Sequence, residues 1–314
     1  MGKASRTKVD ATRRERIAAQ RAAERRAEQR RRILIASGSI IAVIAIVVAF
    51  IVIKANNKPS TTASSNGPTG SALASVVTKV TSVPASTLDT IGDGGGQVSQ
   101  KPQAVKGGTP LTANGKPEML YMGAEYCPYC AAERWAMIVA LSRFGTFSGL
   151  STVHSAAANG AGQAEPYPNT PTWTFHGSSY TSKYLTFTPV ESQTNIPDKS
   201  TGGYTKLETP TSAQTALLNK FDVPPYVPSG SEGAIPFIYF GGKYLIAGAS
   251  YNPQVLAGKS WDQIASALTN PSSDIAKAVG GTANYITAAI CKMTGNQPGS
   301  ACTSTVQSLE NSLK

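Results

Sequence analysis

A short apolar segment leads directly into two closely spaced cysteines, and this arrangement limits the possible folds more than any other feature of the sequence. Residues 119–123 read Met-Leu-Tyr-Met-Gly, a continuous apolar run that predicts a buried central strand. Residues 124–126 suit a tight turn. The segment Cys127-Pro128-Tyr129-Cys130 then opens a mostly apolar stretch that ends at Leu141. The pattern predicts an α/β domain in which a buried helix begins at the cysteine motif.

The predicted helix start gives the first cysteine a chemical role. Cys127 would occupy the N-cap and Pro128 the first helical position, where a missing N–H group costs nothing. Free backbone N–H groups and the helix dipole then favour the thiolate form of Cys127. A thiolate is the attacking species in disulfide exchange. Because Cys130 lies one turn later, within reach to resolve a mixed disulfide, we predict that both cysteines are catalytic.

A purely structural Cys127–Cys130 disulfide and a zinc half-site are the alternative interpretations of the motif. Zinc normally needs four ligands. The remaining candidate ligands contain no second Cys-x-x-Cys pair and are His154, His176, Cys291 and Cys302. We interpret the two histidines as ordinary structural or surface residues. The sequence therefore predicts no metal site and no cofactor.

An uncharged segment of twenty-one residues, Ile33 to Ile53, predicts a single transmembrane helix. At ~1.5 Å per residue it would cover roughly 30 Å of hydrocarbon core. A buried core helix and a cleaved signal peptide are the alternatives, but the thirty-two residues before the segment are long for a signal peptide. Twelve Lys or Arg residues precede the segment and only Lys54 and Lys58 closely follow it. We therefore expect a signal anchor in the plasma membrane, with a cytoplasmic N-terminus.

Charge and composition divide the rest of the chain. We expect a basic cytoplasmic tail at 1–32, the transmembrane helix at 33–53, a flexible Asn/Ser/Thr/Pro/Gly linker at 54–71 and an extracytoplasmic domain at 72–314. The tail is expected to be a solvated topology signal that also touches anionic lipid, with nucleic-acid binding by the tail as the alternative. From Pro59 onward the chain has fifteen basic and fourteen acidic residues, so it lacks the basic face that nucleic-acid binding requires.

Further strands and helices are expected along the domain. Two apolar segments around Gly241-Gly242 predict a hairpin with a two-residue turn. The expected strands are Leu150–His154, Tyr184–Val190, Ile235–Phe240 and Lys243–Ala247, with a short one at Trp173–Phe175. The expected helices are Leu73–Val80, Thr209–Phe221, Trp261–Leu268 and Ile275–Cys291.

The order strand, Cys-Pro-Tyr-Cys, helix, then Ile235-Pro236 leading into a hairpin, resembles the thioredoxin superfamily, with membrane-tethered DsbA-like proteins as the nearest functional class. The segment Gly123–Trp135 also resembles a thioredoxin-like family of unknown function over about residues 71–314. The resemblance implies a thioredoxin-like fold with an insert at about 156–205. It further implies a cis Pro236 that faces the motif, with Ile235, Pro236 and Tyr129 binding substrate. The Pro-Tyr dipeptide is typical of glutaredoxins, unlike the Pro-His of strongly oxidising DsbA.

These features predict a membrane-anchored, extracytoplasmic thiol–disulfide oxidoreductase that acts on protein thiols or disulfides, with a membrane redox partner possible. The direction of the reaction, whether oxidation, reduction or isomerisation, stays open. The alternative is a non-catalytic surface interaction module that keeps the fold but not the turnover.

The second cysteine pair is predicted to form a structural disulfide. Ten residues separate Cys291 from Cys302, and the Gly, Asn and Pro residues among them allow the chain to turn back. An even number of cysteines on the oxidising side usually indicates disulfides. A second redox pair that relays electrons to Cys127 and Cys130 is the alternative, but this spacing lacks the strand-to-helix setting that activates a thiolate.

Overall fold

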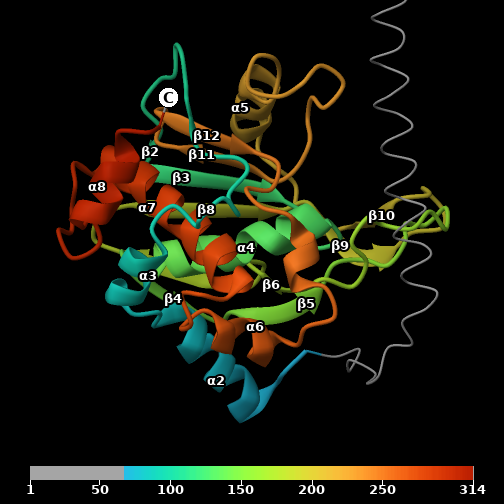
Figure 1. Ribbon diagram of the computed structural model, residues 1–314. Helices are drawn as coiled ribbons and strands as arrows, with labels where there is room; N and C mark the ends of the chain where they lie inside the picture. The colour runs from blue at the N-terminus through green and yellow to red at the C-terminus, as the bar shows by residue number, and fades with distance from the viewer. Residues whose placement is uncertain (1–66, 314) are drawn as a thin grey trace, which may run out of the picture. The chain divides into compact units, whose positions relative to one another are not determined.

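A computed structural model describes residues 67–313 (Figure 1). Its centre is a six-stranded mixed sheet in which hydrogen-bonded neighbours follow the order β1-β12-β11-β3-β2, and β8 also pairs with β3. β3 runs parallel to β8 and antiparallel to β11, and β11 is antiparallel to β12. The strands are β1 (Gln103–Ala104), β2 (Thr112–Ala113), β3 (Lys116–Gly123), β8 (Thr186–Glu191), β11 (Phe237–Phe240) and β12 (Tyr244–Ala247).

Helix α4 (Pro128–Leu141) follows β3 and lies beside the sheet. Every residue of α4 except Tyr129 is buried. The helix packs against α7 (Gly281–Thr294) and against β6 (Pro171–Thr174). Figure 1 shows α4 between the six-stranded sheet and the pair formed by β5 (Ser151–His154) and β6. A buried helix that begins at the cysteine motif was predicted, and this prediction is confirmed.

The remaining helices surround these layers. The π-helical turn Ala276–Gly280 leads directly into α7. Helix α5 covers the opposite face of the sheet, where Phe221 joins a smaller apolar cluster with Phe237 and Tyr239. The bounds are α2 (Gly70–Thr81), α3 (Ala85–Ile91), α5 (Ser212–Phe221), the 3-10 turn Pro253–Leu256, α6 (Trp261–Ala267) and α8 (Ser304–Glu310).

The hairpin between β11 and β12 turns at Gly241 and Gly242, but Phe240 pairs with Tyr244, so Lys243 also belongs to the connection, which has three residues where two were expected. Both glycines have positive φ, 58° and 85°. Glycine adopts positive φ at little cost, so both residues suit this turn. A Cβ atom on Gly242 would also lie 2.1 Å from the Thr109 carbonyl oxygen, so the neighbouring chain leaves no room for a side chain.

The predicted insert contains more strands than expected. It forms parts of three separate two-stranded sheets, β4–β7, β5–β6 and β9–β10. These strands are β4 (Gly145–Ser148), β5 (Ser151–His154), β6 (Pro171–Thr174), β7 (Ser179–Ser182), β9 (Gln193–Pro197) and β10 (Tyr204–Lys206). Most of them are rich in Ser, Thr and Asn. Their sequences therefore lack the alternation of apolar and polar residues that identifies a strand.

The predicted fold class, a thioredoxin-like fold with an insert preceded by a transmembrane helix, needs correction. Residues 67–313 form a mixed α/β domain around a mixed sheet. No helix within this part of the chain is long and apolar enough to cross a membrane. The apolar residues of α4 and α7 are instead buried inside the domain, where the two helices pack together. The expected tail and the segment 33–53 lie outside the described residues, and the expected plasma-membrane location stays a prediction.

The predicted disulfide between Cys291 and Cys302 is confirmed. The Cα atoms of the two residues are 5.8 Å apart, within the ~4.4–6.8 Å that a disulfide permits. The bond joins the last turn of α7 to the residue before the N-cap of α8. It therefore ties the C-terminal helix to the core helix of the domain.

Candidate functional site

Cys127 is positioned by the junction of β3 and α4. It is the N-cap of α4, and its Sγ atom accepts a hydrogen bond from the Cys130 backbone N–H at 3.2 Å. Pro128 occupies the first helical position. Both thiols are free, and both are buried, with 3% of Cys127 and none of Cys130 exposed. The local sequence thus puts one sulfur atom at the helix N-terminus and the other behind it.

The segment before β11 meets the motif from the other side. The Ile235–Pro236 peptide bond is cis, as predicted. The Cys127 thiol donates a hydrogen bond to the Ile235 carbonyl oxygen at 3.6 Å. β11 pairs with β3, which brings together two segments that are 108 residues apart. Cys127, Cys130, Ile235 and Pro236 therefore gather at one end of the sheet, and Tyr129, 38% exposed, faces outward beside them.

The two thiols differ in acidity. Burial raises the pKa of the Cys127 thiol, but hydrogen bonds from Cys130 and the nearby Arg134 charge outweigh it, so the pKa is lowered below its ordinary value. Burial raises the pKa of the Cys130 thiol well above its ordinary value, and the neighbouring Cys127 adds to this effect. Because the thiolate is the reactive species, this pattern fits Cys127 as the nucleophile and Cys130 as the resolving thiol.

A buried ion pair lies beneath the motif and was not predicted. Arg134 is fully buried and donates two hydrogen bonds to Glu191, from Nε at 2.8 Å and from Nη2 at 2.6 Å. Its Nη2 atom also donates to the Ala124 carbonyl oxygen at 2.6 Å. The signal available in the sequence was an arginine four residues after Cys130, next to Glu133 in a mostly apolar helix. Its partner, 57 residues away, could not be identified from spacing.

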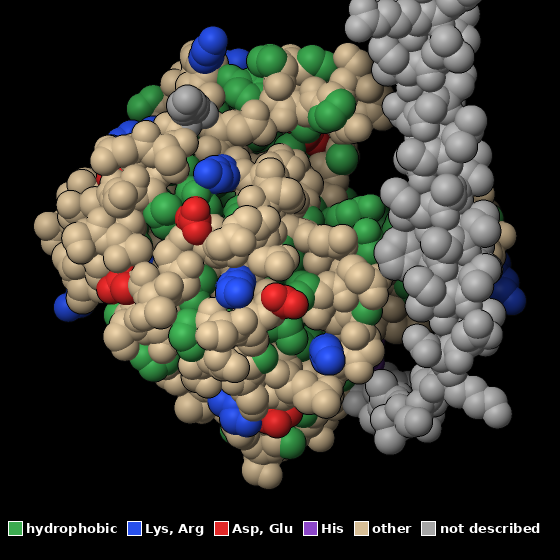
Figure 2. Space-filling model, viewed as in Figure 1, with side chains coloured by type: hydrophobic (Ala, Val, Ile, Leu, Met, Phe, Trp, Pro, Cys, Tyr) green, Lys and Arg blue, Asp and Glu red, His purple; other side chains and the backbone are tan. Residues whose placement is uncertain are grey.

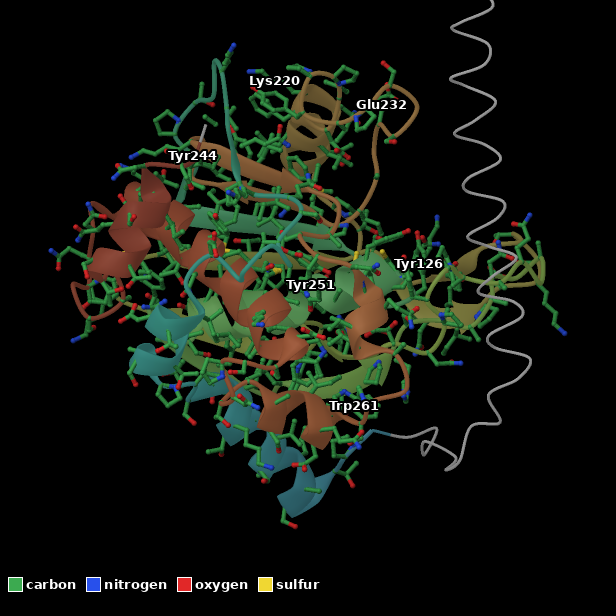
Figure 3. All side chains as sticks on the ribbon, viewed as in Figure 1. Tyr126, Lys220, Glu232, Tyr244, Tyr251 and Trp261 are labelled. Atoms are coloured by element: carbon green, nitrogen blue, oxygen red, sulfur yellow. A yellow bond between two sulfur atoms is a disulfide. The ribbon has the colours of Figure 1, made fainter. Side chains whose placement is uncertain are left out.

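A second buried acid, Glu133 in α4, binds the loop that follows β12. Glu133 accepts hydrogen bonds from the backbone N–H and the hydroxyl of Ser250, both at 2.9 Å. The Tyr251 hydroxyl donates to the Ala132 carbonyl oxygen at 2.6 Å, and Figure 3 labels this tyrosine at the centre of the molecule. Burial raises the pKa of Glu133 to about 7, against the two hydrogen bonds from Ser250.

Tyrosine side chains from the insert pack on the tyrosines of the motif. Tyr126, labelled in Figure 3, stacks on Tyr204 with ring centroids 4.0 Å apart. Tyr129 meets Tyr167 edge to face at 5.7 Å. The Tyr204 hydroxyl donates to Glu165. The insert therefore contributes part of the surface around the cysteines.

A groove of about 570 Å³ begins at the motif. Tyr129 and Ile235 belong to its wall, as do residues of the loop that Glu133 holds. None of its lining residues carries a charged side chain. They are Ser99, Tyr129, Tyr167, Val227, Pro228, Ser231, Ala234, Ile235, Ala247, Gly248, Ala249, Tyr251, Asn252 and Pro253. Such a groove suits an uncharged segment of chain.

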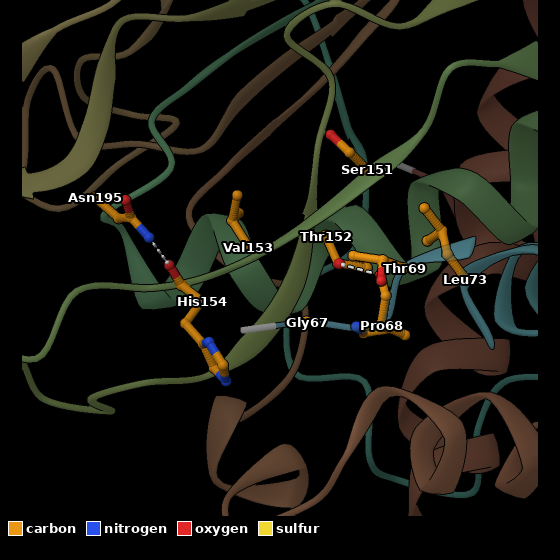
Figure 4. Close-up of a pocket in the computed structure, with 9 residues that line it drawn as sticks. All are labelled: Gly67, Pro68, Thr69, Leu73, Ser151, Thr152, Val153, His154 and Asn195. Carbon is orange, nitrogen blue, oxygen red and sulfur yellow. Dashed lines mark hydrogen bonds between the residues drawn. The ribbon is translucent and has the colours of Figure 1, made fainter. Parts of the chain in front are cut away.

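The histidines are not part of this site. His154 lines a separate pocket of about 360 Å³ between the start of α2 and β5 (Figure 4), and its ring packs edge-on against Trp261. Burial lowers the pKa of His154. His176 is exposed and hydrogen bonds to Glu208. Within residues 67–313, no group of three or more His, Cys, Asp or Glu side chains could hold a metal ion. The face in Figure 2 shows charged side chains scattered in small groups of both signs.

Comparison with known proteins gives one match. A family model described as "Domain of unknown function (DUF929)" matches residues 103–292, a range that contains Cys127, Cys130, Pro236 and Cys291. No curated protein and no solved structure matches the chain. These comparisons do not address the resemblance to thioredoxin and DsbA-like proteins, which stays a prediction.

Proposed function

We propose that this chain, which belongs to the DUF929 family, is a thiol–disulfide oxidoreductase that uses Cys127 and Cys130. The observation that carries the proposal is the contrast between the two thiols. The Cys127 sulfur caps a helix and has a lowered pKa, whereas Cys130 lies behind it with a raised pKa. A dithiol of this kind attacks with one sulfur and keeps the second protonated until it is needed.

Reduction of a substrate disulfide would proceed in two exchanges. The Cys127 thiolate attacks one sulfur of the substrate, a mixed disulfide forms, and the other substrate sulfur leaves as a thiolate that takes up a proton. Cys130 then loses its proton and attacks the Cys127 sulfur, which releases the second substrate thiol and leaves a Cys127–Cys130 disulfide. Two electrons pass from the dithiol to the substrate. The same steps in reverse oxidise a substrate dithiol, and the reduction potentials of the partners set the direction.

An uncharged polypeptide segment is the substrate class that the groove favours. The groove touches both Tyr129 and Ile235, and the Ile235 carbonyl oxygen contacts the Cys127 sulfur. A chain that lies in the groove would therefore pass close to the nucleophile. Because only 3% of Cys127 is exposed, the neighbouring side chains must shift slightly when a substrate sulfur approaches.

Replacement of each cysteine in the full chain tests the proposal. Cys127→Ser should lower the rate of exchange with a fluorescent peptide disulfide by on the order of 10³-fold or more, since the nucleophile is lost. Cys130→Ser should accumulate a mixed disulfide on Cys127, detected by mass spectrometry and released by reductant. The matched control, Cys291→Ala with Cys302→Ala, should keep the exchange rate. Full exchange by Cys127→Ser would contradict the mechanism.

The second candidate function is a non-catalytic interaction module. The near-complete burial of both cysteines favours it, because a buried thiol reacts slowly. The same assay separates the two candidates. Wild-type chain that exchanges no faster than Cys127→Ser would support the interaction module.

A further inference from the structure

Resting on the proposed function, we propose that Arg134 is a positioning residue that stabilises the negative charge of the Cys127 thiolate from inside the domain, and that Glu191 and Ala124 hold its guanidinium in place. Arg134 does not line the groove. It would act through the motif, without touching the substrate.

The placement of Arg134 is the first support. It lies in α4, four residues after Cys130, so it projects from the same side of the helix one turn further on. The Ala124 carbonyl oxygen accepts hydrogen bonds from both the Cys127 backbone N–H, at 3.3 Å, and Arg134 Nη2, at 2.6 Å. One peptide group thus connects the guanidinium to the residue that bears the reactive sulfur.

The hydrogen bonding of the guanidinium is the second support. Nε and Nη2 are occupied by Glu191 and Ala124, but the buried Nη1 atom has no partner within the described structure. Buried donors without a partner are rare in folded proteins, because such a group loses its hydrogen bonds to water and gains none in return. An Nη1 group that is already desolvated needs no reorganisation to interact with a charge that forms nearby.

The charge environment of the motif is the third support. Among the groups of residues 67–313 that chiefly set the acidity of Cys127, Arg134 is the cation, and its charge also lowers the pKa of Cys130 against the effect of burial. The other titratable side chains around the two thiols and the guanidinium are phenols, one thiol and carboxyl groups, and none of them is a cation: Tyr121, Tyr126, Tyr129, Cys130, Glu125, Glu165 and Glu191. No second cation among them could replace Arg134.

A purely structural role for Arg134 would have different consequences. The Arg134–Glu191 pair also fastens α4 to the end of β8. If that were its whole purpose, removal of the pair would change the stability of the domain but not the acidity of Cys127. The pH dependence of Cys127 alkylation in the folded, reduced chain separates these roles, and it does not require exchange activity.

The test uses iodoacetamide on the full chain, with the adduct on Cys127 measured by mass spectrometry as a function of pH. Arg134→Gln with Glu191→Gln removes both charges and keeps amide groups that can hydrogen bond. The midpoint of alkylation should rise by about one pH unit, so that the rate at pH values below the midpoint falls about tenfold. Arg134→Lys alone keeps a positive charge, so its alkylation midpoint should lie between those of wild type and the double variant. The matched control is Arg143→Gln, which removes a half-buried arginine just beyond the other end of α4 and should leave the midpoint unchanged.

Glu191→Gln alone should shift the midpoint of Cys127 alkylation in the opposite direction. It leaves Arg134 without its counter-charge, so the midpoint should fall, and this variant keeps the proposal testable if the double variant does not fold. An unchanged midpoint in the folded double variant, or an unchanged or raised midpoint in Glu191→Gln, would overturn the inference. If the midpoints shift as expected but wild-type chain shows no exchange, the proposed function fails and the electrostatic role stands.

Discussion

The two cysteine pairs of the domain both lie beside the start of a helix, yet they differ in chemistry. Cys127 is itself the N-cap of α4, so its sulfur receives a backbone N–H of the first turn. Cys302 comes one residue before the N-cap of α8, and there the Thr303 hydroxyl accepts the N–H of Val306 instead. Because the cysteine is the N-cap of α4 but precedes the N-cap of α8, a sulfur atom accepts the first-turn N–H in α4 and a hydroxyl oxygen accepts it in α8.

The partners of these residues differ as well. Cys130 belongs to the same helix as Cys127, and both thiols are free. Cys291 belongs to α7, and its bond to Cys302 closes a loop between two helices. Burial does not separate the pairs, since none of the four cysteines is more than 3% exposed. Helix-cap position and nearby charge, rather than exposure, therefore separate the free thiol of Cys127 from the disulfide-bonded Cys302.

The largest expected difference between the pairs is in their reduction potentials. When the oxidised chain is titrated with glutathione buffers and then alkylated, Cys127 and Cys130 should be reduced first. The potential of Cys291–Cys302 should be lower by on the order of 100 mV, because structural disulfides are typically the more resistant to reduction. Mass spectrometry of the alkylated peptides measures both transitions. Reduction of Cys291–Cys302 first, or together with the other pair, would favour a relay role for that disulfide.

Removal of the structural disulfide should cost stability but not activity. The double variant Cys291→Ala, Cys302→Ala should unfold with a free energy lower by roughly 2–4 kcal/mol, because the cross-link restricts the unfolded chain in the loop-closure account. Denaturant unfolding monitored by tryptophan fluorescence gives the difference. The matched control is Cys127→Ala, Cys130→Ala measured in reductant-treated chain, where no cross-link is lost. A loss of exchange activity in the folded Cys291→Ala, Cys302→Ala variant would contradict a purely structural role for this disulfide.

The buried acid Glu133, which follows the two free cysteines in α4, should make stability depend on pH. The pKa of Glu133 is raised from an ordinary value of 4.5 to about 7 in the folded chain. As pH rises from 4.5 to 7, the unfolded chain loses this proton before the folded chain does, so stability falls, by about 3 kcal/mol at ~1.4 kcal/mol per unit. The unfolding free energy of Glu133→Gln should not show this decrease between pH 4.5 and pH 7.

The measurement is denaturant unfolding at pH 5 and pH 8. Between these values Glu133→Gln should gain about 3 kcal/mol relative to wild type. Glu232→Gln, which changes an exposed acid, should follow wild type at both pH values. Parallel behaviour of Glu133→Gln and wild type would show that Glu133 titrates normally.

The smallest expected effect concerns the cap that separates Cys302 from the helix N-terminus. Thr303→Ala removes the side-chain cap of α8 and a hydrogen bond to Asp89, and it should lower the unfolding free energy by about 1 kcal/mol. Thr303→Ser keeps a capping hydroxyl and should cost less. Neither variant should make Cys302 reactive while the disulfide is intact, which alkylation without reductant checks. Rapid labelling of Cys302 in Thr303→Ala would mean that the cap, and not the cross-link, keeps this cysteine inert.

Local chemistry let the sequence determine the start of α4, the glycine hairpin turn and the cysteine pairing near the C-terminus. Each depends on residues within a few positions of one another, such as Pro128 directly after a potential N-cap or Gly241 beside Gly242. The predicted start of α5 was less accurate. A helix was expected from Thr209, but it begins at Ser212, because Thr211 and Gln214 form a capping box after Pro210.

The tertiary structure alone decided what lies around the motif. Arg134 meets Glu191, Glu133 meets Ser250, and Tyr126 meets Tyr204 across separations that no local pattern encodes. In the sequence, Glu133 and Arg134 are two polar residues in an apolar helix and could equally face solvent. They are buried because α4 is covered by α7, β6, α2 and the turns Pro253–Leu256 and Ala276–Gly280, and a buried charge then requires a partner from another element.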